Sequence, residues 1–393
     1  MSRRDVFDVA VVGAGVVGSA AALSLAGEGL RVAIVEAHEP KPWREDDPDL
    51  RVYAFAADAR EFMQSLGVWA GITSARAPAY RCMRVWDAAG GDELRFDADA
   101  LGRECLGHIV ENSLLVDRLW QRICREPAIA RHCPDKLSGL AQEQDGVTLE
   151  LASGQHLRAR LVLGADGAAS RVRSLAGLAV SEHDYGQRGL VAYVRTEKSH
   201  EDTAWQRFLP TGPLAFLPCA DGRSSIVWTL PQAEAERLLA IDAADFCREL
   251  TRAFDARLGE VLEVSARAAF PLRRQLADQM LSGRIALIGD AAHAVHPLAG
   301  QGVNLGLRDV AALREQVREA LANDRDFSAP HRLERWARMR ASENALAAYS
   351  FETINRIFSN DALLPTLLRG PLLGLAGKLP PAVQFLWKRA AGV

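Results

Sequence analysis

The stretch VAVVGAGVVG, residues 9–18, decides the fold because three spaced glycines directly follow a run of small apolar residues. The run Val9 to Val12 predicts a short buried strand. Gly13 then permits a tight turn, Gly15 lets the backbone approach a pyrophosphate, and Gly18 allows a helix to pack closely on the strand. Free N–H groups at the start of that helix attract phosphate charge. The stretch therefore predicts a dinucleotide-binding βαβ unit.

A carboxylate ends the second predicted strand, Arg31 to Val35. Glu36 is placed there to accept hydrogen bonds from the ribose hydroxyls of an adenosine, and its charge disfavours a 2′-phosphate. FAD or NAD is therefore favoured over NADP. A glycine-rich turn alone also occurs in α/β proteins that bind no nucleotide, but the acid at the expected distance favours dinucleotide binding.

A second stretch, GRIALIGDAAHAVHPLAGQGVNLGLRD at residues 283–309, complements the first from far along the chain. Ile285 to Ile288 predicts another buried strand. Asp290 either caps a following helix or also accepts hydrogen bonds from ribityl hydroxyls. Gly300 to Asn304 opens a long helix through Gln316, and its positive N-terminal end suits the N1/C2=O edge of a reduced flavin. The two stretches together predict one FAD held from both ends of the chain.

Four further strings carry a family resemblance: GHIVEN at 107–112, GADGAASRVR at 164–173, FLPTGPLAFLP at 208–218 and HPLAGQGVNLGL at 296–307. On these strings the chain resembles the class A flavoprotein monooxygenases, and within them the UbiH/UbiF/VisC family of ubiquinone-biosynthesis hydroxylases. The similarity extends from about residue 6 to 345.

The resemblance implies roles for individual residues. Arg51 fills the place of an arginine that lies along the flavin diphosphate and ring, and Asn112 matches an amide that meets the ribityl chain. Asp166 stands where the superfamily has an aspartate that touches FAD and is linked to nicotinamide use. Pro297 is similar to a proline whose carbonyl faces the flavin beside the site of oxygen activation. The cofactor-binding set is Gly13, Gly15, Gly18, Glu36, Arg51, Asn112, Asp166, Asp290, Pro297, Gly302, Val303 and Asn304.

Four residues are expected to position the flavin at its reacting face. None of them is assigned as an acid or a base. They are Pro297, Gly300, Gln301 and Gly302. His293 and His296 are interpreted as buried, hydrogen-bonded structure rather than catalysts.

The resemblance and the hydrophobic patterns imply a mixed α/β fold. We expect a Rossmann-like FAD-binding domain of the p-hydroxybenzoate hydroxylase and glutathione reductase type, interleaved with an antiparallel-sheet substrate domain and followed by a helical tail. The expected FAD-binding segments are residues 1–75, 107–180 and 271–330, the substrate segments are 76–106 and 181–270, and the helical region is 331–393.

Runs with a period of two, Gly189 to Arg195 and Ser224 to Leu230, predict antiparallel strands in the substrate domain. We expect the substrate between the flavin ring and this sheet. Four aromatic side chains either line an apolar pocket there or pack in an ordinary core. They are Trp205, Phe208, Phe216 and Trp228.

Composition fits an enzyme with a sizeable core, since 49% of the 393 residues are hydrophobic and 25% are charged. The net charge of -3 gives no electrostatic footprint for nucleic acid. The six cysteines have no CxxC or metal-like spacing, so we expect reduced thiols and no metal site.

The N-terminal sequence resembles a signal peptide, because Arg3-Arg4 precedes an uncharged run. That run contains the dinucleotide turn, however, so we do not expect it to be removed. A cytoplasmic protein without a membrane span is expected.

Residues 362–393 contain basic residues, no Asp or Glu, and many leucines. Such a tail suits short helices on an anionic membrane surface, here the inner face of the cytoplasmic membrane. It equally suits a helical pair packed on its own domain or on a second subunit, and a homo-oligomer or a quinone-biosynthesis complex stays open.

The resemblance thus implies an FAD-dependent monooxygenase that hydroxylates a polyprenylated phenol or quinone precursor with O2 in ubiquinone biosynthesis. The resemblance implies a C4a-hydroperoxide of the flavin as the oxygen donor. The reductant is NAD(P)H or a separate electron-transfer partner. Alternatives are a hydroxylase or epoxidase of another small aromatic or isoprenoid, and a non-catalytic flavoprotein that scaffolds a complex. A flavin halogenase is disfavoured because the string WxWxIP is absent.

Overall fold

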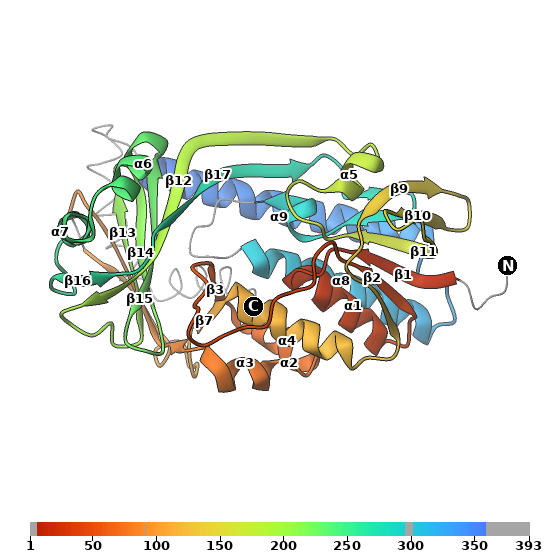
Figure 1. The fold of residues 1–393 in the computed structure, drawn as a ribbon, viewed down its shortest axis with the longest axis horizontal. Coiled ribbons are helices and arrows are strands. Elements are labelled where there is room, and N and C mark those ends of the chain that lie inside the picture. The colour runs from red at the N-terminus through yellow and green to blue at the C-terminus, as the bar shows by residue number, and fades with distance from the viewer. Residues whose placement is uncertain (1–5, 91, 295–301, 359–393) are drawn as a thin grey trace.

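The computed structural model describes residues 6–90, 92–294 and 302–358. Two large sheets lie at opposite ends of the molecule, and the long strands β12 (Val180–Thr196) and β17 (Ala268–Ala277) run between them (Figure 1). The expectation of a mixed α/β fold is confirmed.

The first sheet has the order β18-β19-β11-β1-β2-β8, and β10 and β9 extend it from β11. Its central strand β1 pairs in parallel with both β2 and β11. Val9, Ala10 and Val11 on β1 are fully buried, as in a parallel sheet covered on both faces. The strands are β1 (Val6–Val12), β2 (Val32–Val35), β8 (Ile129–His132), β9 (Leu137–Gln142), β10 (Val147–Leu151), β11 (His156–Gly164), β18 (Leu281–Ser282) and β19 (Ile285–Leu287).

Helix α1 (Val16–Gly27) packs against α4 (Asn112–Cys124) and α8 (Gly302–Ala322) beside this sheet (Figure 1). Small residues make the close approach feasible, because Ala20, Ala21 and Ala22 are fully buried in α1. At Gly306 on α8 an added Cβ would lie 2.6 Å from the Val17 side chain. The helix predicted after the glycine turn therefore brings the two distant sequence stretches together.

The second sheet has the order β20-β17-β12-β15-β14-β13-β5-β6, with β16 paired to β12. Its neighbours are antiparallel except β13 and β5. Helices α6 (Gln232–Ala240) and α7 (Ala243–Ala253) pack on this sheet and complete a second hydrophobic core. The remaining strands are β5 (Cys82–Asp87), β6 (Leu94–Asp97), β13 (Thr203–Leu209), β14 (Gly212–Pro218), β15 (Ser224–Pro231), β16 (Val261–Val264) and β20 (His293–Ala294).

A small antiparallel sheet in the order β3-β7-β4 completes the set of strands in the described residues. Its strands are β3 (Val52–Phe55), β4 (Ala79–Tyr80) and β7 (Gly107–Glu111). The other helices are α2 (Ala57–Ser65), α3 (Trp69–Arg76), α5 (Arg171–Leu175) and α9 (Pro330–Phe358). None of the helices in the described ranges is long and apolar enough to cross a membrane.

Two local expectations need correction. Asp290 does not cap a helix, because it lies inside a one-turn 3-10 helix, η2 (Gly289–Ala291), that leads into β20. The expected substrate segment ended at residue 270, whereas β17 continues in the second sheet to Ala277.

Candidate functional site

A cavity of about 1100 Å³ is lined by residues of both large sheets. Most of the described residues of the predicted cofactor set meet there from segments far apart in the sequence, whereas Gly18 and Asn304 do not line the cavity. Those on the cavity wall are Gly13, Gly15, Glu36, Arg51, Asn112, Asp166, Asp290, Gly302 and Val303. Pro297, Gly300 and Gln301 lie outside the described residues.

The glycine turn has the geometry that a bound diphosphate needs. Gly13 has a φ of 104°, and a Cβ there would collide with the carbonyl oxygen of Ala165. A Cβ on Gly18 would collide with the carbonyl oxygen of Gly13. A Cβ on Gly15 would instead meet nothing within 4 Å, because Gly15 faces the open cavity at the start of α1. The first N–H groups of that helix have no partner within the helix and can bind an anion.

Glu36 lies across this turn. Its Oε2 accepts a hydrogen bond of 2.6 Å from the backbone N–H of Ala14, and its Oε1 accepts one of 3.1 Å from His38. Glu36 lines the cavity together with Asp135 and Lys136. The carboxylate is therefore held beside the diphosphate turn, where the ribose of an adenosine would lie.

Arg51, Tyr53 and Asn112 form another part of the wall. The Arg51 side chain is exposed to the cavity, with its guanidinium carbon 5.7 Å from the centre of the Phe270 ring. Tyr53 donates a hydrogen bond of 3.3 Å from its hydroxyl to Oδ1 of Asn112. Burial raises the pKa of Tyr53 to about 12, so its hydroxyl stays protonated at neutral pH. Sequence reasoning did not identify Tyr53.

The loop that carries Asp166 is tied to the turn that carries Asp290. Asp166 accepts hydrogen bonds from the Ser170 hydroxyl at 2.5 Å and from the backbone N–H of Arg171 at 2.7 Å, so it holds the start of α5. The buried Arg173 of α5 donates to the carbonyl oxygen of Ala291 at 2.9 Å. The two aspartates consequently lie on one connected piece of the wall.

Asp290 is the acidic residue of the cavity wall whose carboxylate lacks hydrogen-bond partners among the described residues. Its side chain is accessible from the cavity. Burial raises the pKa of Asp290, although the positive charges of His293 and Arg51 act to lower it. A bound group with hydroxyl donors would satisfy this carboxylate, as the ribityl chain of a flavin would.

His293 belongs to a buried cluster around Asp309 rather than to the cavity. Its Nε2 lies 2.5 Å from Oδ2 of Asp309, which also accepts from the backbone N–H of Gly289 at 3.1 Å. The other carboxylate oxygen accepts from Arg340 at 2.9 Å and Asn344 at 3.0 Å. Burial alone would raise the pKa of Asp309, but these partners hold it below its ordinary value. The interpretation of His293 as hydrogen-bonded structure is confirmed, whereas His296 lies outside the described residues.

Asn304 points away from the cavity. Its Nδ2 donates to the carbonyl oxygen of Ala54 at 2.9 Å, and its Oδ1 accepts from the N–H of Ala56 at 3.3 Å. The side chain thus fixes the first turn of α8 to the end of β3, while Gly302 and Val303 reach the cavity wall.

The expected aromatic pocket is corrected by the strand register. Trp205, Phe216 and Trp228 lie on the face of the second sheet under α6 and α7, where they pack in its hydrophobic core. Phe208 packs in a separate cluster with Phe96. Side chains alternate between the two faces of a strand, so their sequence neighbours occupy the opposite face. The residues that line the cavity on strands β12, β14 and β15 of this sheet include Gly189, Val191, Leu217 and Val227, and residues 270–275 of β17 line it as well. The period-two pattern separates these residues from the aromatic ones, but it does not tell which face of the sheet meets the cavity.

The cavity therefore fits an FAD molecule along its polar wall and an apolar compound along its apolar wall. The described residues contain no group of three or more His, Cys, Asp or Glu side chains able to hold a metal ion.

A profile described as the FAD binding domain family matches residues 6–341 of the chain. The 3-demethoxyubiquinol 3-hydroxylase of Escherichia coli K12 is 38% identical over 369 residues, which cover 94% of this chain and 93% of that protein. The ubiquinone hydroxylase UbiL of Rhodospirillum rubrum is 36% identical over 391 residues, covering 100% and 91%.

Among solved structures, p-nitrophenol 4-monooxygenase PnpA of Pseudomonas putida DLL-E4 superposes with a TM-score of 0.80 at 20% identity and covers 98% of both chains. At 20% identity this structural similarity shows only that the two proteins share a fold. The family is shown by the profile match and by the sequence relatives. The chain belongs to the FAD binding domain family and is an FAD-dependent monooxygenase of class A, in the group that contains the ubiquinone-biosynthesis hydroxylases.

Proposed function

We propose that this monooxygenase hydroxylates the aromatic ring of a prenylated phenol or quinone precursor in ubiquinone biosynthesis, with O2 as co-substrate. The supporting observation is a single cavity with a polar wall that fits FAD and an apolar wall formed by Val191, Leu217 and Val227. Two of its relatives are named 3-demethoxyubiquinol 3-hydroxylase and ubiquinone hydroxylase UbiL.

The polar wall would bind FAD from several directions. The backbone N–H groups after Gly15 and the positive end of α1 favour the diphosphate, and Glu36 is placed for the adenosine ribose. Asp290 would accept hydrogen bonds from the ribityl hydroxyls, with Arg51 and Asn112 beside the same chain. The segments within residues 1–75, 107–180 and 271–330 would in this way act as the cofactor-binding part.

The apolar wall would orient the ring and exclude water. When bound, FAD supplies the activation of O2 and the transfer of one oxygen atom. The chain contributes a dry surface at Val191, Leu217 and Val227, which limits the unproductive release of hydrogen peroxide. Gly302 and Val303 place the positive end of α8 at the cavity, where it favours negative charge on a reduced cofactor.

A membrane contact is also proposed, because a prenylated substrate dissolves in lipid. The support is the composition of residues 362–393, which are basic, acid-free and rich in leucine. Each basic residue near an anionic surface contributes about 1 kcal/mol. These residues lie outside the described ranges.

Quinone-intermediate profiling of a strain that lacks the gene tests this function. We expect a prenylated precursor that is short of one ring hydroxyl to accumulate, and re-expression of the wild-type chain to restore ubiquinone. An unchanged quinone profile in the deletion strain would contradict the proposal.

A further inference from the structure

Asp49 forms hydrogen bonds with both Arg51 and Asn112, two residues of the cavity wall. We infer that Asp49 is a positioning residue, which fixes the backbone of Arg51 and the side chain of Asn112 beside the flavin and ties both to the substrate sheet. The inference rests on the proposed roles of Arg51 and Asn112 at FAD.

Both oxygens of the Asp49 carboxylate face donors. Oδ1 accepts a hydrogen bond of 2.9 Å from the backbone N–H of Arg51. Oδ2 accepts one of 3.0 Å from the N–H of Ser113 and one of 3.4 Å from Nδ2 of Asn112. Only an acceptor at both positions satisfies these three donors, and an amide side chain would turn an NH2 group toward one of them.

The bond to Asn112 also sets the orientation of its amide. Because Nδ2 points to Asp49, Oδ1 is left to accept from the hydroxyl of Tyr53 at 3.3 Å. The backbone N–H of Asn112 donates to the carbonyl oxygen of Arg51 at 2.9 Å. Arg51, Tyr53 and Asn112 all line the cavity, so one carboxylate organises a continuous patch of its wall.

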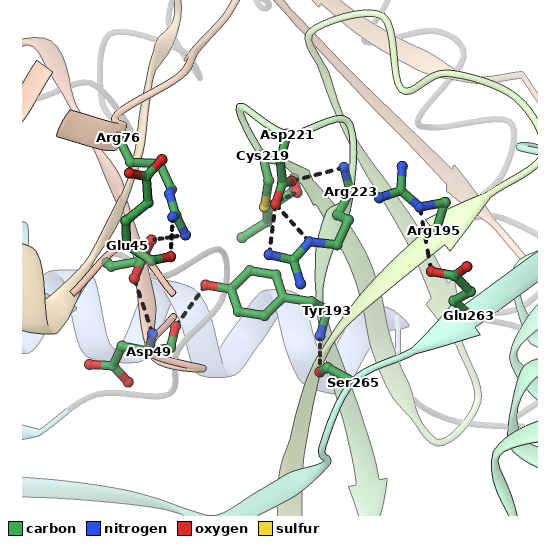
Figure 2. Close-up of polar contacts among 12 residues, drawn as sticks. Glu45, Asp49, Arg76, Tyr193, Arg195, Cys219, Asp221, Arg223, Glu263 and Ser265 are labelled. Carbon is green, nitrogen blue, oxygen red and sulfur yellow. Dashed lines mark hydrogen bonds and ion pairs between the residues drawn. The ribbon is translucent and has the colours of Figure 1, made fainter. Parts of the chain in front are cut away.

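The backbone of Asp49 is fixed as firmly as its side chain. Its N–H donates to Oε2 of the buried Glu111 at 3.0 Å, and Glu111 also pairs with Arg76 at 3.1 Å. Its carbonyl oxygen accepts a hydrogen bond of 2.7 Å from the hydroxyl of Tyr193. Figure 2 shows Tyr193 pointing from β12 toward Asp49. β12 also carries Val191 on the apolar wall, so this bond connects the two walls of the cavity.

A helix-capping role is the simpler alternative, because the bond to Ser113 satisfies an N–H in the first turn of α4. Capping predicts a change in stability alone. Positioning predicts that the folded protein binds FAD more weakly, and that this effect depends on Arg51 and Asn112.

The test compares Asp49→Asn with Asp47→Asn, which makes the same charge change at an exposed residue of the same loop. Proteins are prepared with excess FAD, which stabilises the folded state, and FAD dissociation is then measured by flavin fluorescence. We expect Asp49→Asn to weaken FAD binding about tenfold, and Asp47→Asn to match the wild type. In a protein that already carries Arg51→Ala and Asn112→Ala, Asp49→Asn should reduce FAD affinity much less than it does in the wild type.

Unchanged FAD affinity in folded Asp49→Asn would overturn the inference, as would an equal loss with and without Arg51 and Asn112. If Asp49→Asn does not fold, the FAD affinity of the milder variant Tyr193→Phe tests the inference instead. This variant removes one neutral hydrogen bond, so about two- to tenfold weaker binding is expected, and wild-type affinity would overturn the inference. These readouts need no quinone substrate, so they are independent of the proposed function.

Discussion

Gly18 lies so close to the carbonyl oxygen of Gly13 that no side chain fits between them. This contact holds α1 against the glycine turn and points its first N–H groups at the cavity. Gly15, between the two, has no neighbour within 4 Å of the position a Cβ would take. Glycines of one motif therefore serve two different purposes, which substitution can separate.

Gly18→Ala should destabilise the fold, whereas Gly15→Ala should leave the fold intact and impair cofactor binding. Overpacking at Gly18 costs about 1–3 kcal/mol. At Gly15 the added methyl group enters the open space that a diphosphate would occupy, and a tenfold loss of FAD affinity corresponds to about 1.4 kcal/mol. Thermal unfolding without FAD and a fluorescence titration with FAD measure the two effects. Wild-type FAD affinity in Gly15→Ala would place the diphosphate elsewhere.

Asp290→Asn should weaken FAD binding about tenfold, because a neutral acceptor replaces a charged one. Visible absorbance after gel filtration reports retained flavin. Equal retention of flavin by Asp290→Asn and the wild type would exclude Asp290 from the site.

His108 should make the free energy of unfolding dependent on pH. Burial, with the positive charge of Arg60, lowers the pKa of His108 from 6.5 to about 4. The unfolded chain therefore takes up a proton at a higher pH than the folded protein, and stability falls as the pH drops from about 6.5 toward 4. Urea unfolding at pH 7 and pH 5 should show a smaller decrease for His108→Gln than for the wild type. The exposed His38→Gln is the control, and equal decreases in all three proteins would refute the expectation.

Much of the cofactor side could be predicted from sequence. The glycine turn from Gly13 to Gly18 and the acid Glu36 are local sequence patterns, and the structure brings them to one cavity with Asp290, although the helix expected after Asp290 is a 3-10 turn. The substrate side could not be predicted as well. Trp205, Phe216 and Trp228 are larger than their neighbours, but size does not reveal which face of a strand is covered by helices.

Asp49 and Tyr53 were missed for a different reason. Their significance comes from partners far along the chain, since Asp49 meets Ser113 and Tyr193, and Tyr53 meets Asn112. No short motif records such contacts. The role of the Asn304 side chain was likewise visible only once its bonds to Ala54 and Ala56 were known.

Truncation after Asp361 should reduce sedimentation of the protein with anionic liposomes, because it removes the basic, acid-free tail. Added salt should weaken the binding of the full-length protein, since charge attraction is screened. Circular dichroism must show the shortened protein folded. Unchanged liposome binding after truncation would assign the tail to packing or to a subunit contact.

The most direct test of the central claim is the origin of the new ring oxygen. Purified enzyme with FAD, a chemical or enzymatic reductant and the prenylated precursor is supplied with ¹⁸O2, and product and hydrogen peroxide are quantified together. We predict one ¹⁸O atom in the hydroxylated ring. In Gly302→Val, where the new side chain stands at the cavity end of α8, product should fall about 100-fold while peroxide persists. A product whose new oxygen comes from water, or complete conversion of O2 to peroxide by the wild type, would contradict the account.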